Sequence, residues 1–202
     1  WTLCKPSNNK KISNLAVSET GLGNPEDKIL KNKRKTLGLL RDLKNIKTVG
    51  VINEDKEKGI IEIAKPVGIV AAVTPSTNPA ATPINNIINA LKGRNSIIVS
   101  PSPAGSKVFR DLLILINNEL KKIGAPENLI QTFNCDVTKE LTNELMKNVD
   151  LVIVTGSLNN VREAAKSGTK AIGVGQGNVI SIVDETADLV DAFKKIKMSK
   201  TF

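Results

Sequence analysis

From residue 66 onward, short runs of apolar residues alternate with longer stretches that mix apolar and polar positions. The apolar runs lie at 68–73, 96–99, 129–132, 151–154 and 171–174. Each is too continuous to be half exposed, which is typical of strands buried on both faces. The stretches at 80–91, 106–123, 139–147 and 159–166 place apolar residues at helical spacing. This alternation predicts an α/β fold, a parallel sheet with helices on both faces.

The chain before residue 66 follows different patterns. Residues 5–20 have a helical spacing of apolar residues and end at Gly21 and Gly23, and Asn24 followed by Pro25 then begins a second helix. The basic stretch 28–44 spaces its leucines as an amphipathic helix does. Residues 49–52 and 60–63 are rich in β-branched residues and flank the charged turn 53–59, which predicts a projecting β-hairpin.

Composition narrows the functional classes. The chain has 202 residues, 40% of them hydrophobic, enough for one large domain or one domain plus an appendage. Its net charge is +9, but only 2% of residues are aromatic and the lysines are scattered, so we do not expect nucleic-acid binding. No apolar run approaches the ~18 residues that a membrane span needs. With no signal peptide in view, we expect a cytoplasmic protein and no membrane partner.

Histidine and cysteine usage excludes several chemistries. The chain has no histidine, which removes the Ser-His-Asp and Cys-His catalytic arrangements. Its two cysteines, Cys4 and Cys135, are not in metal-ligand spacing, so no metal site is expected.

Polar loops follow four of the five predicted strands. Ligands of parallel sheets bind at the carboxyl ends of the strands, and hydroxyl groups and helix N-terminal amides there suit a nucleotide or pyrophosphate. The glycine-rich stretch 173–178 does not complete the G-x-G-x-x-G motif, so it carries little weight alone. The alternative is that these are ordinary strand-to-helix turns with capping residues. The candidate coenzyme-binding residues are Thr74, Pro75, Ser76, Thr77, Ser100, Pro101, Ser102, Pro103, Thr155, Gly156, Ser157, Asn160, Val174 and Gly175.

Four long segments, in order along the chain, resemble the CoA-acylating branch of the aldehyde dehydrogenase superfamily. That branch includes acetaldehyde, succinate-semialdehyde and sulfoacetaldehyde dehydrogenases. The segments are SETGLGNPEDKILKNKRKT (18–36), KPVGIVAAVTPSTNPAATPINNIINALKGRNSIIVSPSP (65–103), VDLVIVTGSLNNVREAAKSGTKAIGVGQGN (149–178) and VDETADLVDAFKKIKMSKTF (183–202).

The resemblance implies a Rossmann-like sheet domain and an oxidoreductase that reversibly converts a small aldehyde to acyl-CoA. It implies NAD as coenzyme, with NADP possible, CoA as co-substrate, and a homo-oligomer. It divides the chain into N-terminal helices (1–47), a hairpin that serves as an oligomerisation arm (48–65), a nucleotide-binding domain (66–177) and the first strand and helix of a catalytic domain (178–202). By resemblance Asn78 faces the aldehyde oxygen, a role worth about 3–4 kcal/mol of barrier. The alternative is that Asn78 caps the helix beginning at Ala80.

Two departures from the wider superfamily matter. Hydrolytic aldehyde dehydrogenases carry a Glu where this chain has Gly173, and without that base the thioester is left for CoA. The family's nucleophilic cysteine follows an SKTF-like segment, with which this sequence ends, and neither Cys4 nor Cys135 matches its context. We therefore expect the 202-residue chain to be inactive alone. The alternative function is a non-catalytic nucleotide-binding or assembly module derived from the family.

Overall fold

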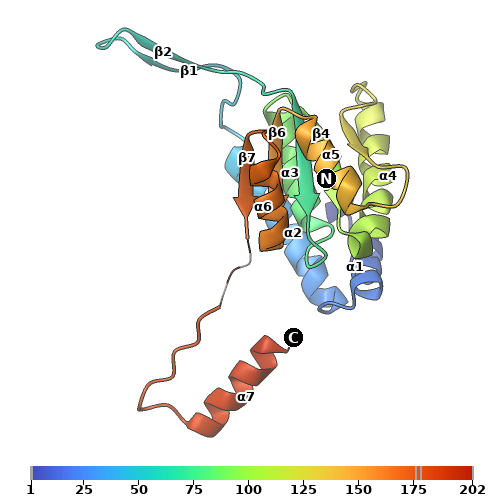
Figure 1. Cartoon of the computed structure of the whole chain (residues 1–202), viewed down its shortest axis with the longest axis vertical. Coiled ribbons are helices and arrows are strands. Elements are labelled where there is room, and N and C mark those ends of the chain that lie inside the picture. The colour runs from blue at the N-terminus through green and yellow to red at the C-terminus, as the bar shows by residue number, and fades with distance from the viewer. Residues whose placement is uncertain (1, 176, 178, 202) are drawn as a thin grey trace.

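The protein is described by a computed structural model that covers residues 2–175, 177 and 179–201. Its centre is a parallel sheet with the strand order β5-β4-β3-β6-β7 (Figure 1). The strands are β3 (Ile69–Thr74), β4 (Ser96–Pro101), β5 (Ile130–Thr132), β6 (Leu151–Thr155) and β7 (Ala171–Val174). All five predicted strands are thus confirmed, with boundaries that differ by at most two residues.

The chain builds the sheet outward from β3 in two opposite directions. The chain builds β3, β4 and β5 outward to one edge, then returns to place β6 on the free side of β3 and β7 beyond it. Val70 of β3 accordingly pairs with Ile97 of β4 on one side and Leu151 of β6 on the other. The change of direction falls between β3 and β6, where ligands of open α/β sheets bind.

Helices cover both faces of the sheet, as predicted (Figure 1). Alternate side chains of β3 enter two separate cores, Val70 and Ala72 on one face and Ala71 and Val73 on the other. The first core also contains side chains of α1 (Pro6–Thr20), α3 (Ala81–Lys92) and α4 (Ser106–Lys122), with α2 (Pro25–Leu43) packed against it. The second contains Met146 of α5 (Lys139–Lys147) and Ala164 of α6 (Leu158–Lys166).

The N-terminal helices begin and end as the sequence predicts. Gly21 ends α1 in the left-handed conformation with a φ of 65°, and the Asn24 side chain accepts a hydrogen bond from the backbone N–H of Asp27 at the start of α2. Cys4 lies just before α1, on a separate 3₁₀ turn (Thr2–Cys4), and is half-buried. Pro6 starts a new helix after that turn.

The hairpin projects from the sheet domain as predicted, but its strands are longer (Figure 1). β1 (Gly50–Asp55) pairs with β2 (Ile60–Ala64), so the turn is shorter than the expected 53–59. The Asp55 carboxylate accepts hydrogen bonds from the N–H groups of Glu57 and Lys58, which closes a tight turn after it. Cross-strand pairing thus extends into residues 53–55, which were expected in the turn because the segment is charged.

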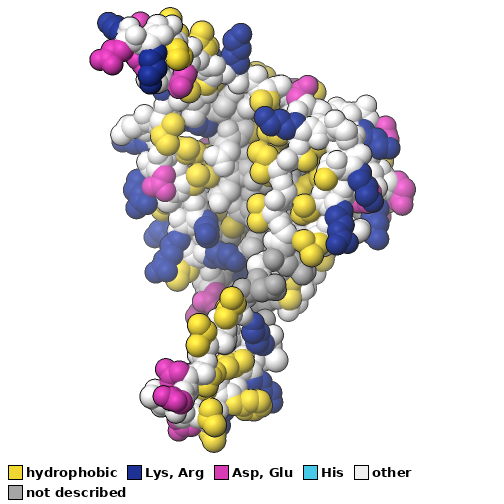
Figure 2. Space-filling view, turned by 60° about the vertical axis from the view of Figure 1, so that its left-hand side comes forward, with side chains coloured by type: hydrophobic (Ala, Val, Ile, Leu, Met, Phe, Trp, Pro, Cys, Tyr) yellow, Lys and Arg dark blue, Asp and Glu magenta, His cyan; other side chains and the backbone are white. Residues whose placement is uncertain are grey.

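The last segment stands apart from the sheet and ends in α7 (Leu189–Lys200) (Figure 1). The strand expected at its start is not formed in residues 179–188, because no neighbouring strand offers hydrogen-bond partners there. Ile180 is 81% exposed and Ile182 is 90% exposed. Figure 2 shows hydrophobic side chains gathered on this segment and on the hairpin at the opposite end of the molecule.

Candidate functional site

A cavity of about 960 Å³ lies at the carboxyl ends of β3, β4 and β6, where the strand order reverses. The loops after these three strands all contribute to it, so the structure brings together the candidate residues of the first three polar loops. The cavity is lined by Thr74, Pro75, Ser76, Thr77, Asn78, Ser100, Pro101, Ser102, Pro103, Thr155, Gly156, Ser157 and Asn160 among the predicted residues. Of the fourth loop, Gly175 lines the cavity but Val174 does not, and Gln176 and Asn178 lie outside the described residues.

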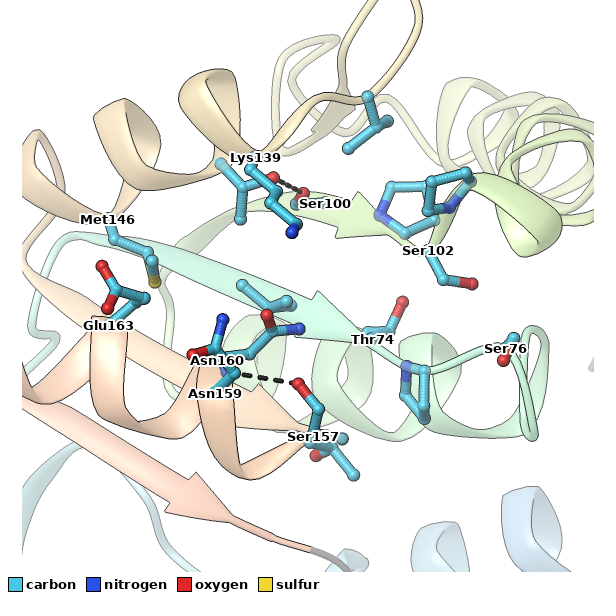
Figure 3. Close-up of a pocket in the computed structure, with 18 of the residues that line it drawn as sticks. Thr74, Ser76, Ser100, Ser102, Lys139, Met146, Ser157, Asn159, Asn160 and Glu163 are labelled. Atoms are coloured by element: carbon cyan, nitrogen blue, oxygen red, sulfur yellow. Dashed lines mark hydrogen bonds between the residues drawn. The ribbon is translucent and has the colours of Figure 1, made fainter.

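The ends of β3 and β4 are joined in the wall of the cavity (Figure 3). The backbone N–H of Ser102 donates to the carbonyl of Thr74 over 3.0 Å. The hydroxyl oxygens of both residues are buried, and neither has a hydrogen-bond partner among the described residues. Buried hydroxyls without partners are costly, so these two oxygens point to a polar ligand that would complete their hydrogen bonding.

Asn78 does not use its side chain to cap α3. The N-cap position is Ala80, with no side-chain cap, and Asn78 contributes only its backbone carbonyl, 3.4 Å from the N–H of Thr82. The Asn78 Oδ1 atom is buried without a partner among the described residues. The capping alternative is therefore wrong, and the amide at the edge of the cavity has no structural task that the hydrogen bonds explain.

The loop after β6 serves partly as an ordinary helix cap, which was the other interpretation of these turns. The Ser157 hydroxyl accepts a hydrogen bond from the Asn160 N–H over 3.2 Å at the start of α6, as Figure 3 shows. Ser157, Asn159 and Asn160 at the start of α6 line the cavity, and a helix N-terminus favours an anion. Capping and anion binding are thus compatible at this helix.

One wall of the cavity was missed by the sequence analysis. It is formed by one side of α5, from Lys139 through Thr142 to Met146, and by Glu163 of α6 (Figure 3). The Ser100 and Thr142 hydroxyls lie 2.8 Å apart and link this wall to β4. Periodicity located α5, but only the strand order shows that the chain returns beside β3 and brings α5 to the cavity.

Two glycines, Gly173 in β7 and Gly175 in the loop after it, lie close to side chains of α6. A Cβ atom on Gly173 would lie 2.6 Å from Val161 Cγ1, and one on Gly175 would lie 2.8 Å from Leu158 Cδ2. A side chain at position 173 would displace Val161, whereas one at position 175 would only require the exposed Leu158 side chain to move. A glutamate at position 173 would therefore need Val161 to shift, in addition to the chemical difference that the resemblance suggests.

Residues 2–175, 177 and 179–201 contain no cluster of three or more Asp, Glu, Cys or His side chains that could hold a metal ion. Over the same residues, no helix is both long enough and apolar enough to cross a membrane.

Comparison with known proteins identifies related chains that share this architecture. A sulfoacetaldehyde dehydrogenase (acylating) of Cupriavidus necator is 55% identical over all 202 residues, which are 41% of its length. The crystal structure of an acetylating aldehyde dehydrogenase from Geobacillus thermoglucosidasius is 40% identical with a TM-score of 0.85, and the match covers 97% of this chain and 44% of that one. An engineered glycolyl-CoA reductase with bound NADP⁺ is 34% identical with a TM-score of 0.77, covering 93% and 42% of the two chains.

The chain thus spans less than half the length of each of these relatives. The model of the aldehyde dehydrogenase family matches residues 9–202, nearly the whole sequence. On this match, and on its fold, the chain belongs to the aldehyde dehydrogenase family.

Proposed function

We propose that this chain is the coenzyme-binding part of an NAD(P)-dependent, CoA-acylating aldehyde dehydrogenase. The observation that carries the proposal is the cavity at the strand-order reversal, whose wall holds two hydroxyls, of Thr74 and Ser102, with no partner among the described residues. The relatives support the chemistry, since one is named acylating and another is a glycolyl-CoA reductase with bound NADP⁺. The substrate is a small aldehyde, with CoA as acyl acceptor, and we propose a cytoplasmic location.

The residues of the cavity fit a dinucleotide. Its volume of about 960 Å³ lies at the upper end of the range for small-molecule sites, about 300–1,000 Å³. The N-terminus of α6 offers N–H groups to a phosphate, and Thr74 and Ser102 offer hydroxyls to ribose or phosphate oxygens. The Lys139 side chain lines the same cavity and adds a cation for the phosphates. The adenosine part of CoA could use the same loops in turn.

The bound coenzyme would supply the hydride acceptor, and the residues of this chain would orient the groups around it. Asn78 would donate its side-chain amide to the aldehyde oxygen, which becomes negatively charged when a thiolate attacks the carbonyl carbon. Pro75 and Pro79 restrict the loop on either side of Asn78 and keep the donor in place. The thiolate and the rest of the aldehyde site would come from a part of the enzyme outside this cavity.

Neither cysteine of the chain is placed to be that nucleophile. Cys4 lies on the N-terminal 3₁₀ turn and Cys135 on an exposed loop after β5, and neither lines the cavity. Burial raises the pKa of the Cys4 thiol, against a smaller opposing effect of Lys33, which disfavours the reactive thiolate. We therefore propose that the 202-residue chain binds nucleotide without oxidising aldehydes.

We also propose that the hairpin packs on a second copy of the protein. Ile52, Ile60, Ile61 and Ile63 are each between 46% and 56% exposed on two short strands. An uncovered two-stranded hairpin with these side chains is marginally stable in water and prone to pair with other strands. A partner surface would cover it, consistent with the homo-oligomer that the resemblance implies.

The binding proposal is tested by titrating the 202-residue chain with NADH, NADPH and CoA in a calorimeter. We expect saturable one-to-one binding of a reduced coenzyme, and competition between it and CoA for the cavity. A Ser157→Trp variant, which places a bulky ring at the mouth of the cavity, should abolish the heat of binding while far-ultraviolet circular dichroism stays unchanged. The absence of binding of all three ligands to the wild-type chain would refute the proposal.

The catalytic part is tested by adding a short aldehyde, NAD and CoA to the same protein and following the absorbance of reduced coenzyme. We expect none to form. Protein-dependent turnover that disappears in a Cys135→Ser variant would show that the nucleophile lies in this chain, contrary to the proposal.

A further inference from the structure

A buried lysine of α2 contacts the loop that carries Asn78. Lys28 is only 9% exposed, and its Nζ atom donates a hydrogen bond of 2.7 Å to the backbone carbonyl of Thr77. The two residues are 49 positions apart, so the bond joins the N-terminal helices to the loop after β3. Among the described residues, no carboxylate forms an ion pair with Lys28. The lysine side chain is thus largely buried, and its ammonium has a neutral carbonyl as its hydrogen-bond acceptor.

The loop between β3 and α3 is fixed at three points. At its start, the Thr74 carbonyl accepts a hydrogen bond from the Ser102 N–H. At its end, Pro79 lies against Gly105, where an added Cβ would be only 3.1 Å from Pro79 Cβ. Between these points the Lys28 ammonium holds the Thr77 carbonyl. That carbonyl belongs to the peptide bond whose nitrogen is the backbone nitrogen of Asn78, so its orientation sets the orientation of Asn78.

The energetics argue against a purely stabilising role. Burial, with a smaller effect from Lys31, lowers the pKa of Lys28 from its ordinary value, so the folded protein disfavours the charge that the hydrogen bond uses. A buried charge without a counterion costs stability, and an apolar residue of similar volume is often neutral or stabilising in its place. Residues that break such a local rule tend to lie at functional sites.

We propose that Lys28 is a positioning residue, whose hydrogen bond to the Thr77 carbonyl orients the Thr77–Asn78 peptide and with it the Asn78 amide at the cavity. The proposal rests on the proposed function for its purpose, because the loop is the one assigned to the coenzyme and the aldehyde oxygen. Its structural content, a peptide oriented by one ammonium, can be tested without any ligand.

The sequence allows this peptide to be observed almost alone. Thr is followed by Asn at only two places, Thr77–Asn78 and Thr142–Asn143. A sample labelled with ¹³C at threonine carbonyls and ¹⁵N in asparagine therefore gives two cross-peaks in a carbon-detected spectrum that correlates each carbonyl carbon with the next nitrogen. The Thr142–Asn143 peptide lies in α5, on the other face of the sheet, and serves as an internal control.

The test compares Lys28→Met with Lys31→Met, which removes the same charge from an exposed position one turn along α2. We expect Lys28→Met to move the Thr77–Asn78 cross-peak, with the carbonyl carbon shifted upfield by the loss of its donor, and to leave the Thr142–Asn143 cross-peak in place. Lys31→Met should move neither. The midpoint of thermal unfolding of Lys28→Met should equal or exceed that of the wild type.

A second measurement links the peptide to ligand binding. If the loop contacts the coenzyme, Lys28→Met should weaken NADH binding about fivefold, because the loop must then be ordered on binding, whereas Lys31→Met should bind as the wild type does. An unmoved Thr77–Asn78 cross-peak in Lys28→Met overturns the positioning role. So does unfolding of that variant, seen as movement of both cross-peaks, since it would make Lys28 a structural residue. Failure of the wild-type chain to bind NADH would instead count against the proposed function and leave the spectral result valid.

Discussion

Hydroxyl groups at the cavity and away from it differ in whether they have a hydrogen-bond partner. Thr74 and Ser102 each bury a hydroxyl without a partner among the described residues, whereas the half-buried Thr132 has a hydroxyl that donates to the Val99 carbonyl over 2.9 Å. Removing a paired hydroxyl and removing an unpaired one should have opposite effects on stability. The change in stability on removing a hydroxyl therefore distinguishes a structural role from a ligand-binding role.

We predict that Thr74→Val and Ser102→Ala do not lower the midpoint of thermal unfolding, and that each weakens NADH binding about fivefold, as expected for one hydrogen bond of ~1 kcal/mol. The control is Thr132→Val, which breaks the bond to Val99 away from the cavity and should lower stability by about 1 kcal/mol without changing the affinity. Calorimetry and thermal unfolding measure both quantities. A loss of stability in Thr74→Val with unchanged affinity would assign that hydroxyl to the fold.

The two cysteines should differ in reactivity. Cys135 is exposed, whereas Cys4 is half-buried and its thiol has a raised pKa caused mainly by burial. The thiolate is the reactive form, so raising the pKa lowers the thiolate fraction at every pH below it and moves the rise in rate to higher pH. With limiting iodoacetamide at pH 8, we predict that mass spectrometry finds modification first at Cys135. Equal rates at both sites would contradict the placement of Cys4.

The loop residues of the cavity could be predicted from the sequence, whereas contacts between residues far apart in the chain could not. Thr74, Ser100 and Thr155 could be predicted because each directly follows an apolar run, and such positions share one edge of a parallel sheet. The hydrogen bond from Lys28 to the Thr77 carbonyl could not be predicted, because a backbone carbonyl has no sequence signature and the partners are 49 residues apart. The role of Asn78 came from resemblance, and the cap geometry then removed its simplest structural explanation.

At the scale of elements, periodicity predicted nearly every helix and strand but not their neighbours. The order β5-β4-β3-β6-β7 depends on which side of β3 the chain returns to, and a pattern of apolar residues does not contain that information. The turn was predicted to begin at Asn53 because residues 53–55 are polar. In the structure these three residues are extended, because they pair with residues 60–62 of β2. The strand expected at the start of the last segment is not formed in residues 179–188, since apolar residues form a strand only beside a partner strand.

The hairpin gives a prediction for assembly. If it packs on a second copy, Ile61→Lys should place a charge in that interface and dissociate the oligomer, because an unpaired charge there would be desolvated. Ile123→Lys is the matched control, since Ile123 is 77% exposed at the end of α4, away from the hairpin. Light scattering at micromolar concentration should show an oligomer for the wild type and for Ile123→Lys, and a monomer for Ile61→Lys. A monomeric wild type would exclude the interface in this chain.

At the scale of the whole molecule, the sheet domain and the last segment contribute very differently to stability. Both hydrophobic cores are built from residues before position 165, and α7 contains no buried residue. The Lys200 ammonium donates to the Val179 carbonyl, a contact within the last segment itself. The segment exposes large apolar side chains, including Phe193 at 66% and Met198 at 70%. Surface of this kind is typical of a face that further polypeptide covers.

We predict that a chain ending at residue 177 keeps the stability and ligand binding of the 202-residue chain. The buried apolar area that drives folding lies in the sheet domain, and the described cavity lining ends at Gly177, so neither should need the last segment. Thermal unfolding should give the same midpoint, and calorimetry the same NADH affinity. Binding of a dye that reports exposed apolar surface should fall, because the side chains of 179–201 are removed. A clear drop in the unfolding midpoint would mean that α7 packs on the sheet domain in solution and that its side chains belong to the core.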